Sequence, residues 1–413
     1  MKEGLNIGFK KSTDDLPKTL WETYSSFANT DGGKIYLGVA EDKVTGEPIY
    51  LGVNNTQKIL DKFWATINNS NKVSYNLLTY SDVKILNIEG KDIIEINVPK
   101  APRGFRPIYI NNNLNGGTYI RQGDGDFKCG KDMLYAMIRD SGSTTDDSII
   151  IYDMNIQDLS KDTIESYRRV FRTNQPDHYW NDLSNEEFLL RIGALAKSKG
   201  EVYCTKAGLL MFGYDYSILR IFPNYFMDYR ENLTELSRYD QRVETGDGSS
   251  EGNIYRFFTK MMMFLSGSIS EPFRLQDGIF REGDSSGKAI IREAVLNAIT
   301  NADFNISNNV IIERIKNKII ITNSGGFRVP IGSGISDPRN AILMGMFRNI
   351  HTVERAGTGI KRIFDVADEY GWSVEYTEEF NPERVKLIIS NVDSLNYKKD
   401  ELDRLKTVHR MNL

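Results

Sequence analysis

Residues 291–304 read IREAVLNAITNADF, and their apolar positions recur at the spacing of an amphipathic helix. Glu293 and Asn297 lie four residues apart in this stretch, so they share one face of the predicted helix. A carboxylate can orient or deprotonate a water molecule, and an amide oxygen can ligate Mg²⁺. Taken alone, such a pair is usually just part of a solvated helix face.

Paired glycines follow the next strongly apolar stretch, residues 318–327, which reads KIIITNSGGF. The run of isoleucines predicts a strand, and Gly325 with Gly326 follows Asn323-Ser324 at its end. Glycines allow a sharp bend and the close approach of a ligand to the backbone. In isolation, a simple turn at the end of a strand explains this motif as well.

A third motif, VERAGTGIKRI at residues 353–363, opens a predicted helix that Gly371 would stop. Gly357, Thr358 and Gly359 precede its first full turn. Free backbone N–H groups at a helix start, with glycines beside them, form an anion site. A flexible entry into a helix is the alternative interpretation.

In this order, the three motifs resemble the N, G1 and G2 boxes of the Bergerat-fold (GHKL) ATPases. The divergent RecG-like ATP-binding branch, found at the carboxy end of many bacterial regulators, is the best match. DPRNAIL at residues 337–343 also resembles that branch. The resemblance covers most of residues 276–390 and implies ATP and Mg²⁺ as cofactors.

The resemblance also implies a role for each motif residue. Glu293 would be the catalytic base, and the nucleotide would be bound by Asn297 (which would also ligate Mg²⁺), Asn323, Gly325, Gly326, Gly357, Thr358 and Gly359. Residues 329–354 would form a lid that is mobile without nucleotide. Two departures stand out: Asn323 replaces the usual Asp that faces adenine, and Asn301-Ala302-Asp303 lacks the usual His and Arg.

The amino-terminal sequence carries a second resemblance. FANTDGGKIYLGV (27–39), with looser matches in NIGFKKS (6–12), GFRPIYI (104–110) and GGTYIRQGDGDFKCG (116–130), resembles the Schlafen AlbA-type nucleic-acid-binding domain. Positive and negative side chains nearly balance in residues 1–140, so any phosphate-binding surface must be local. The candidate cations are Lys10, Lys11, Lys34, Arg103, Arg106 and Arg121, and Phe105, Tyr109 and Tyr119 are candidates for stacking on bases.

Some members of this family are RNases with clustered carboxylates. Glu3 matches the first acid of the family pattern, but Gly8 and Ala40 stand where the other two belong. Metal-dependent cleavage of a phosphodiester needs several carboxylates to hold the ion. We therefore do not expect nuclease activity.

These matches predict an α+β protein with an AlbA-like mixed α/β domain, an α/β connecting region and a Bergerat-type α/β sandwich. The polar stretch DSGSTTDDS (140–148) is the best linker candidate. The expected parts are residues 1–140, 150–275, 276–391 and a polar tail at 392–413.

Composition limits the function classes. Of 413 residues, 40% are hydrophobic and 26% are charged, as in ordinary globular chains. A net charge of -4 excludes a strongly basic coat protein. Two cysteines, Cys129 and Cys204, cannot build a disulfide framework or a four-cysteine zinc site. Neither a signal peptide nor a membrane span is recognisable, so we expect a cytoplasmic protein without a membrane partner.

Three functions remain open from the sequence. The first is a nucleic-acid-binding transcriptional regulator, with DNA as the expected partner and ATP as a conformational switch. The second is a Mg²⁺-dependent ATPase that works through Glu293. The third is an interaction protein in which both ligand sites have decayed. Homo-oligomerisation is compatible with all three.

Overall fold

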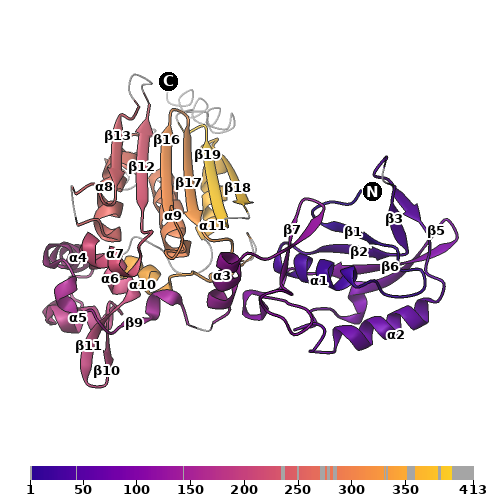
Figure 1. Ribbon diagram of the computed structural model, residues 1–413. Coiled ribbons are helices and arrows are strands. Elements are labelled where there is room, and N and C mark those ends of the chain that lie inside the picture. Colours follow the sequence, from indigo (N-terminus) through magenta and orange to yellow (C-terminus); the bar gives the residue numbers. More distant parts are fainter. Residues whose placement is uncertain are drawn as a thin grey trace, which may run out of the picture. The chain divides into compact units, whose positions relative to one another are not determined.

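A computed structural model describes residues 2–42, 44–142, 144–233, 238–248, 251–269, 275–276, 280–281, 286–329, 331, 334–350, 359–379 and 383–392. The chain forms two compact units (Figure 1). The amino-terminal unit spans Met1–Ser143, and the carboxy-terminal unit begins at Thr144. Strands and helices alternate in both, which confirms the predicted α+β class.

The amino-terminal unit is built on a four-stranded sheet of order β1-β2-β6-β5. β1 and β2 pair in parallel, and the other neighbours are antiparallel. Glu89 and Gly90, both with positive φ, make the tight turn of the β5–β6 hairpin. The strands of this unit are β1 (Ile7–Lys10), β2 (Gly33–Leu37), β3 (Val39–Glu41), β4 (Pro48–Tyr50), β5 (Val83–Ile88), β6 (Lys91–Val98), β7 (Tyr119–Gln122) and β8 (Gly125–Lys128).

Two helices, α1 (Thr19–Asn29) and α2 (Thr56–Ile67), pack their apolar faces on this sheet. Leu20, Tyr24 and Phe27 of α1 are buried at helical spacing, as the sequence pattern predicts. The β7–β8 hairpin contacts α1, and α3 (Lys131–Ser141) follows it. The single-turn helix η2 (Arg103–Phe105) lies beside α3.

The carboxy-terminal unit is a sandwich of a six-stranded sheet and helices, with strand order β13-β12-β16-β17-β19-β18. β12 and β16 pair in parallel, and the remaining neighbours are antiparallel. The sheet strands are β12 (Met227–Asn232), β13 (Gln241–Glu244), β16 (Val310–Ile315), β17 (Lys318–Ser324), β18 (Ser373–Glu379) and β19 (Arg384–Ser390). Smaller pairings involve β9 (Ile150–Ile151), β10 (Leu195–Ser198), β11 (Glu201–Thr205), β14 (Leu275–Gln276) and β15 (Phe280–Arg281).

Helices α8, α9 and α11 cover one face of this sheet (Figure 1). Their apolar side chains and those of the sheet belong to one continuous core. The helices of the unit are α4 (Lys161–Asn174), α5 (Asn185–Arg191), α6 (Lys206–Phe212), α7 (Asp215–Ile221), α8 (Ile254–Gly267), α9 (Ser286–Asn301), α10 (Ala341–Asn349) and α11 (Gly359–Glu369). Because β12 and β13 belong to the six-stranded sheet, much of residues 150–275 shares this core with the carboxy-terminal motifs.

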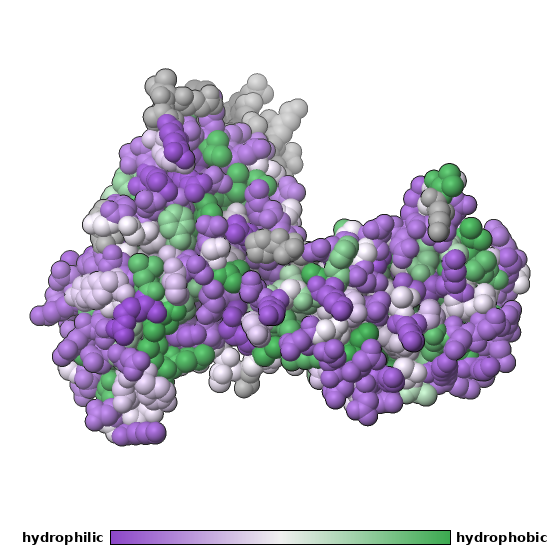
Figure 2. Space-filling view, in the orientation of Figure 1, coloured by the Kyte–Doolittle hydropathy of each residue, from purple (hydrophilic) through white to green (hydrophobic). Residues whose placement is uncertain are grey.

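Hydrophilic side chains predominate on the face of the molecule drawn in Figure 2, and apolar side chains form small separate patches there. None of the helices in the described ranges is both long enough and apolar enough to cross a membrane. Cys129 and Cys204 are both buried. Burial raises the pKa of the Cys204 thiol to about 12, so it is an unreactive core residue.

Candidate functional site

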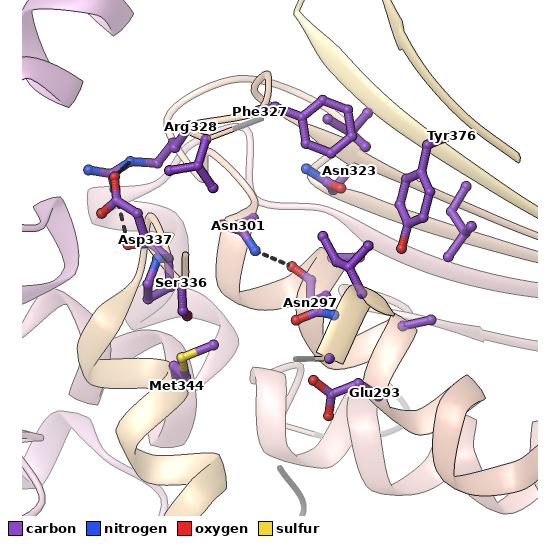
Figure 3. Close-up of a pocket in the computed structure, with 18 of the residues that line it drawn as sticks. Glu293, Asn297, Asn301, Asn323, Phe327, Arg328, Ser336, Asp337, Met344 and Tyr376 are labelled. Carbon is purple, nitrogen blue, oxygen red and sulfur yellow. Dashed lines mark hydrogen bonds and ion pairs between the residues drawn. The ribbon is translucent and has the colours of Figure 1, made fainter. Parts of the chain in front are cut away.

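A cavity of about 410 Å³ lies in the carboxy-terminal unit between the six-stranded sheet and helices α9, α10 and α11 (Figure 3). It brings together residues that are far apart in sequence. From the predicted set, the cavity is lined by Glu293, Asn297, Asn323, Gly326 and Gly359. The first three motifs of the sequence analysis therefore meet at one place in the fold.

Glu293 and Asn297 face the cavity from neighbouring turns of α9 (Figure 3). Nδ2 of Asn297 is buried and has no hydrogen-bond partner within the described part of the chain. A buried N–H donor without a partner costs about 1–3 kcal/mol, so an acceptor atom of a ligand in the cavity, such as a phosphate oxygen, would stabilise this group. An amide oxygen and a nearby carboxylate also suit Mg²⁺, which is usually held by one or two protein oxygens, waters and phosphates.

Gly359 begins α11 directly against Glu293. A Cβ atom built on Gly359 would lie 2.3 Å from Oε1 of Glu293, so any other residue displaces that carboxylate. Gly357 and Thr358 lie outside the described residues. The glycine at position 359 therefore allows the start of a helix, with its free N–H groups, to approach the carboxylate side of the cavity.

Asn323 faces the cavity from the end of β17 and is 6% exposed. Its Nδ2 donates to the carbonyl of Ser324 at 3.0 Å, which orients the side chain. Tyr376 of β18 projects toward α9 beside it (Figure 3). Burial raises the pKa of Tyr376, and the negative charge of Glu293 raises it further, so the phenol stays neutral.

The two glycines after Asn323 have different roles. Gly326 lines the cavity, and a Cβ there would lie 2.4 Å from Oε1 of Glu378, which also accepts the Phe327 N–H at 2.7 Å. Gly325 has φ +83° and faces the guanidinium of Arg339 instead of the cavity. The expectation that Gly325 contacts the base or ribose is therefore corrected: it makes the turn that presents Gly326.

Arg339 and Asn340, for which no role was predicted, support this turn. The buried Arg339 donates through Nε to the Asn301 carbonyl at 3.0 Å and through Nη2 to the Gly326 carbonyl at 3.1 Å. Asn340 donates to the Ala302 carbonyl at 2.8 Å. The pair ties the glycine turn to the end of α9. The DPRNAIL motif contained this signal, but its contacts required the fold.

The segment expected to be a lid, residues 329–354, contains α10 in its described part. Leu343, Met346 and Phe347 of α10 are fully buried in the core. Residues 341–349 are therefore a packed wall of the cavity, not a mobile flap, because this face of the helix is apolar. Positions 330, 332, 333 and 351–354 lie outside the described residues.

Arg121 requires a second correction. Its side chain is 1% exposed and pairs with Asp126, with 2.9 Å between Nη1 and Oδ1. Its other nitrogens donate to the carbonyls of Gly4 and Ile7, and the guanidinium lies over the Phe27 ring. Arg121 is thus a buried residue that anchors the amino-terminal segment, and it cannot reach a phosphate in this fold.

The other predicted cations lie nearer the surface. Lys11 is exposed, and Lys34 is exposed but pairs with Glu95 at 3.2 Å. Burial lowers the pKa of the half-buried Lys10, opposed by the charges of Asp126 and Glu3. Two arginines donate to main-chain carbonyls, Arg103 to Asp140 and Gly142 and Arg106 to Ala101.

Phe105 is 45% exposed and stacks on Tyr75, with 4.3 Å between their ring centroids. This exposed ring fits the stacking role suggested for it, since a base could extend the stack. Tyr119 instead hydrogen-bonds Glu22 at 3.2 Å. The stacking partner, Tyr75, was not recognised from the sequence because it lies 30 residues before Phe105.

The acidic pattern of the family nucleases is altered in three dimensions as well. Oε1 of Glu3 accepts the Phe9 N–H at 3.2 Å, and burial raises the pKa of Glu3. A Cβ on Gly8 would lie 3.1 Å from the Thr23 methyl, facing α1. An acid at this position would therefore be directed into packed side chains.

Comparison with known proteins gives three family matches. Residues 3–130 match "Schlafen, AlbA_2", residues 135–228 match "Domain of unknown function (DUF8451)", and residues 307–387 match "Putative ATP-dependent DNA helicase recG C-terminal". No curated protein matches the chain. The matches confirm the combination of an AlbA_2 domain with a RecG-type HATPase-like domain, and they indicate a nucleic-acid-related protein.

Two solved structures are similar to the chain. The DIP2311 protein from Corynebacterium diphtheriae is 18% identical over 94% of this chain, with a TM-score of 0.45. The chain spans 64% of that protein's length. The N-terminal domain of a RecG-related putative ATP-dependent DNA helicase from Nitrosomonas europaea is 24% identical; the match covers 30% of this chain and 82% of that domain, with a TM-score of 0.23.

Proposed function

We propose that this chain, which joins an AlbA_2 domain to a RecG-type HATPase-like domain, is a nucleic-acid-binding transcriptional regulator switched by Mg·ATP. The buried, unpartnered amide of Asn297 in a 410 Å³ cavity is the observation that carries the proposal. Cavities of about 300–1,000 Å³ suit small-molecule ligands.

In this proposal, different residues of the cavity bind the base, the phosphates and the metal ion. Asn323 and Tyr376 on the sheet side bind the base, with the Asn323 amide oxygen accepting from an exocyclic amine. The start of α11 at Gly359 donates N–H groups to the phosphates. Asn297 holds Mg²⁺, and the ion would supply charge neutralisation at the phosphates.

Asn297→Ala is expected to weaken Mg·ATP binding by about tenfold, because it removes the amide oxygen that is proposed to ligate the ion. Binding of ATP in the presence of EDTA should change much less. Isothermal titration calorimetry of the wild-type protein and of Asn297→Ala, with and without metal, measures the difference. Asn224→Ala, at an exposed turn before β12, is a matched control.

Equal losses with and without metal would contradict the assignment of Asn297 to the ion. Absence of nucleotide binding by the wild-type protein would contradict the whole site. If nucleic acid also fails to bind, an interaction protein with decayed ligand sites becomes the better interpretation.

The amino-terminal unit is proposed to bind nucleic acid, with DNA as the expected form, through phosphate contacts. Lys11→Ala should weaken binding to all sequences alike and reduce the salt dependence by about one released counterion, because Lys11 is an exposed cation. Fluorescence anisotropy across a salt series measures both effects. Lys197→Ala, an exposed lysine of β10, should leave them unchanged. Binding that does not depend on salt would contradict this interface.

An active ATPase is the second candidate. Glu293 favours it, because its carboxylate lies in the same cavity as Asn297 and against the start of α11. A base there could activate a water molecule beside the phosphates. Sustained release of phosphate from Mg·ATP would favour this candidate, whereas binding without release would favour the switch.

A further inference from the structure

Helix α10 is capped at its start by a residue from a distant segment. Asn340, the residue before the helix, donates to the Ala302 carbonyl and makes no cap of its own. The N–H groups of Ile342 and Leu343 instead donate to Oδ2 of Asp147, at 2.8 and 3.0 Å. Helix starts have unpaired N–H groups and partial positive charge, so a carboxylate there stabilises the helix.

Asp147 is held in place by its own neighbours. It is 1% exposed, and the Thr145 hydroxyl donates to its other oxygen. The adjacent Asp146 pairs with Lys206 at 2.9 Å and accepts from Asn305 at 3.1 Å. Residues 145–147 therefore contact both α10 and the loop that follows α9, the two elements beside the cavity.

The capped helix is also a wall of the nucleotide cavity. Ala341, Met344 and Arg348 of α10 line it, and Ala341 directly precedes the first capped N–H group. Figure 3 shows Met344 on this wall. Asp147 itself does not line the cavity. It can therefore influence a bound nucleotide only through the placement of α10.

The position of Asp147 in the chain gives this contact a second consequence. The amino-terminal unit ends at Ser143, and Thr144 begins the carboxy-terminal unit. Asp147 thus lies four residues after the point at which the chain leaves the amino-terminal unit. Residues 144–149, here called the junction, are held on α10 by Asp147.

We propose that Asp147 is a positioning residue of the nucleotide site, which sets α10 against the cavity and transmits nucleotide occupancy to the junction. This inference rests on the proposed binding of Mg·ATP. A nucleotide that contacts α10 favours the capped arrangement, and the cap in turn orders the junction. By linkage, the ordered junction strengthens nucleotide binding by the same factor.

Hydrogen exchange of the full chain, with and without saturating Mg·ATP, tests the proposal. In the wild-type protein, nucleotide should slow exchange together in peptides covering residues 341–349 and 144–149. In Asp147→Ala, which removes the capping oxygen, slowing at the junction should be lost while residues 359–369 still respond. Affinity for Mg·ATP should fall about fivefold, the size of a lost helix cap. Asp153→Ala, at an exposed acid nearby, should behave as wild type.

Thr145→Val is a milder variant in case Asp147→Ala fails to fold. It removes only the hydroxyl that donates to Asp147 and should reduce the junction response in part. A full junction response in both variants would overturn the proposal, as would a wild-type protein that binds nucleotide without slowing the junction. If calorimetry finds no nucleotide binding by the wild-type protein, the proposed function fails, and this inference fails with it.

Discussion

Replacing Gly359 with valine is expected to reduce Mg·ATP binding at least about a hundredfold, equivalent to about 2.7 kcal/mol. The first added carbon would lie 2.3 Å from Oε1 and 3.1 Å from Cδ of Glu293. The two further methyl groups would occupy the space in front of the first N–H groups of α11. Because those groups are proposed to bind the phosphates, the loss should appear in calorimetry for ATP and ADP alike.

A loss of folding is not expected to explain this result. Gly359 is not among the glycines with positive φ, so valine can adopt its backbone conformation. Gly267→Val is a suitable control, since Gly267 also lies in a helix and has open space around its Cβ position. If Gly359→Val binds Mg·ATP like the parent and keeps its thermal stability, the phosphate assignment is wrong.

Arg121→Ala is expected to destabilise the amino-terminal unit by about 3–5 kcal/mol, the usual cost of breaking a buried ion pair. The change leaves Asp126 without its guanidinium and removes the donors to the Gly4 and Ile7 carbonyls. The amino-terminal segment and β1 should loosen first. Hydrogen exchange of peptides from this unit measures the effect separately from the carboxy-terminal unit.

Lys11→Ala is the matched comparison for this second prediction, because Lys11 is exposed and follows β1. It should change the stability by no more than about 0.5 kcal/mol while weakening nucleic-acid binding. If Arg121→Ala leaves hydrogen exchange unchanged but lowers the affinity for nucleic acid, our interpretation of both residues is wrong. Arg121 would then belong to the nucleic-acid-binding surface.

Local sequence patterns were sufficient for the cavity motifs of α9 and β17. Glu293 and Asn297 share a face because their spacing of four fits the helix period, whatever packs around them. Asn323 and Gly326 reach the cavity because they lie at the end of β17, a buried strand of the sheet that lines it. The family resemblances added the order of these motifs, and the family matches confirm both resemblances.

Burial and long-range contacts could not be predicted from local sequence patterns. Arg121 looked like an exposed cation beside candidate aromatic residues, but its environment is set by Gly4, Ile7 and Asp126 after folding. Likewise, Gly325 and Gly326 are adjacent in sequence, but Gly325 faces the Arg339 guanidinium while Gly326 lines the cavity. A residue's neighbours in the chain do not specify which distant side chain will cover it.

The fold class, the pairing of the two domain types and the motifs of α9 and β17 could all be predicted from the sequence. Only the folded chain reveals that α10 is a wall and not a lid, and that its start is capped by Asp147, 195 positions away. Helical and strand periodicities arise from interactions within a few residues, so they are visible in the sequence. A helix cap from a residue far away in the chain depends on how the packed elements meet, and no local sequence pattern indicates which distant residues will come together.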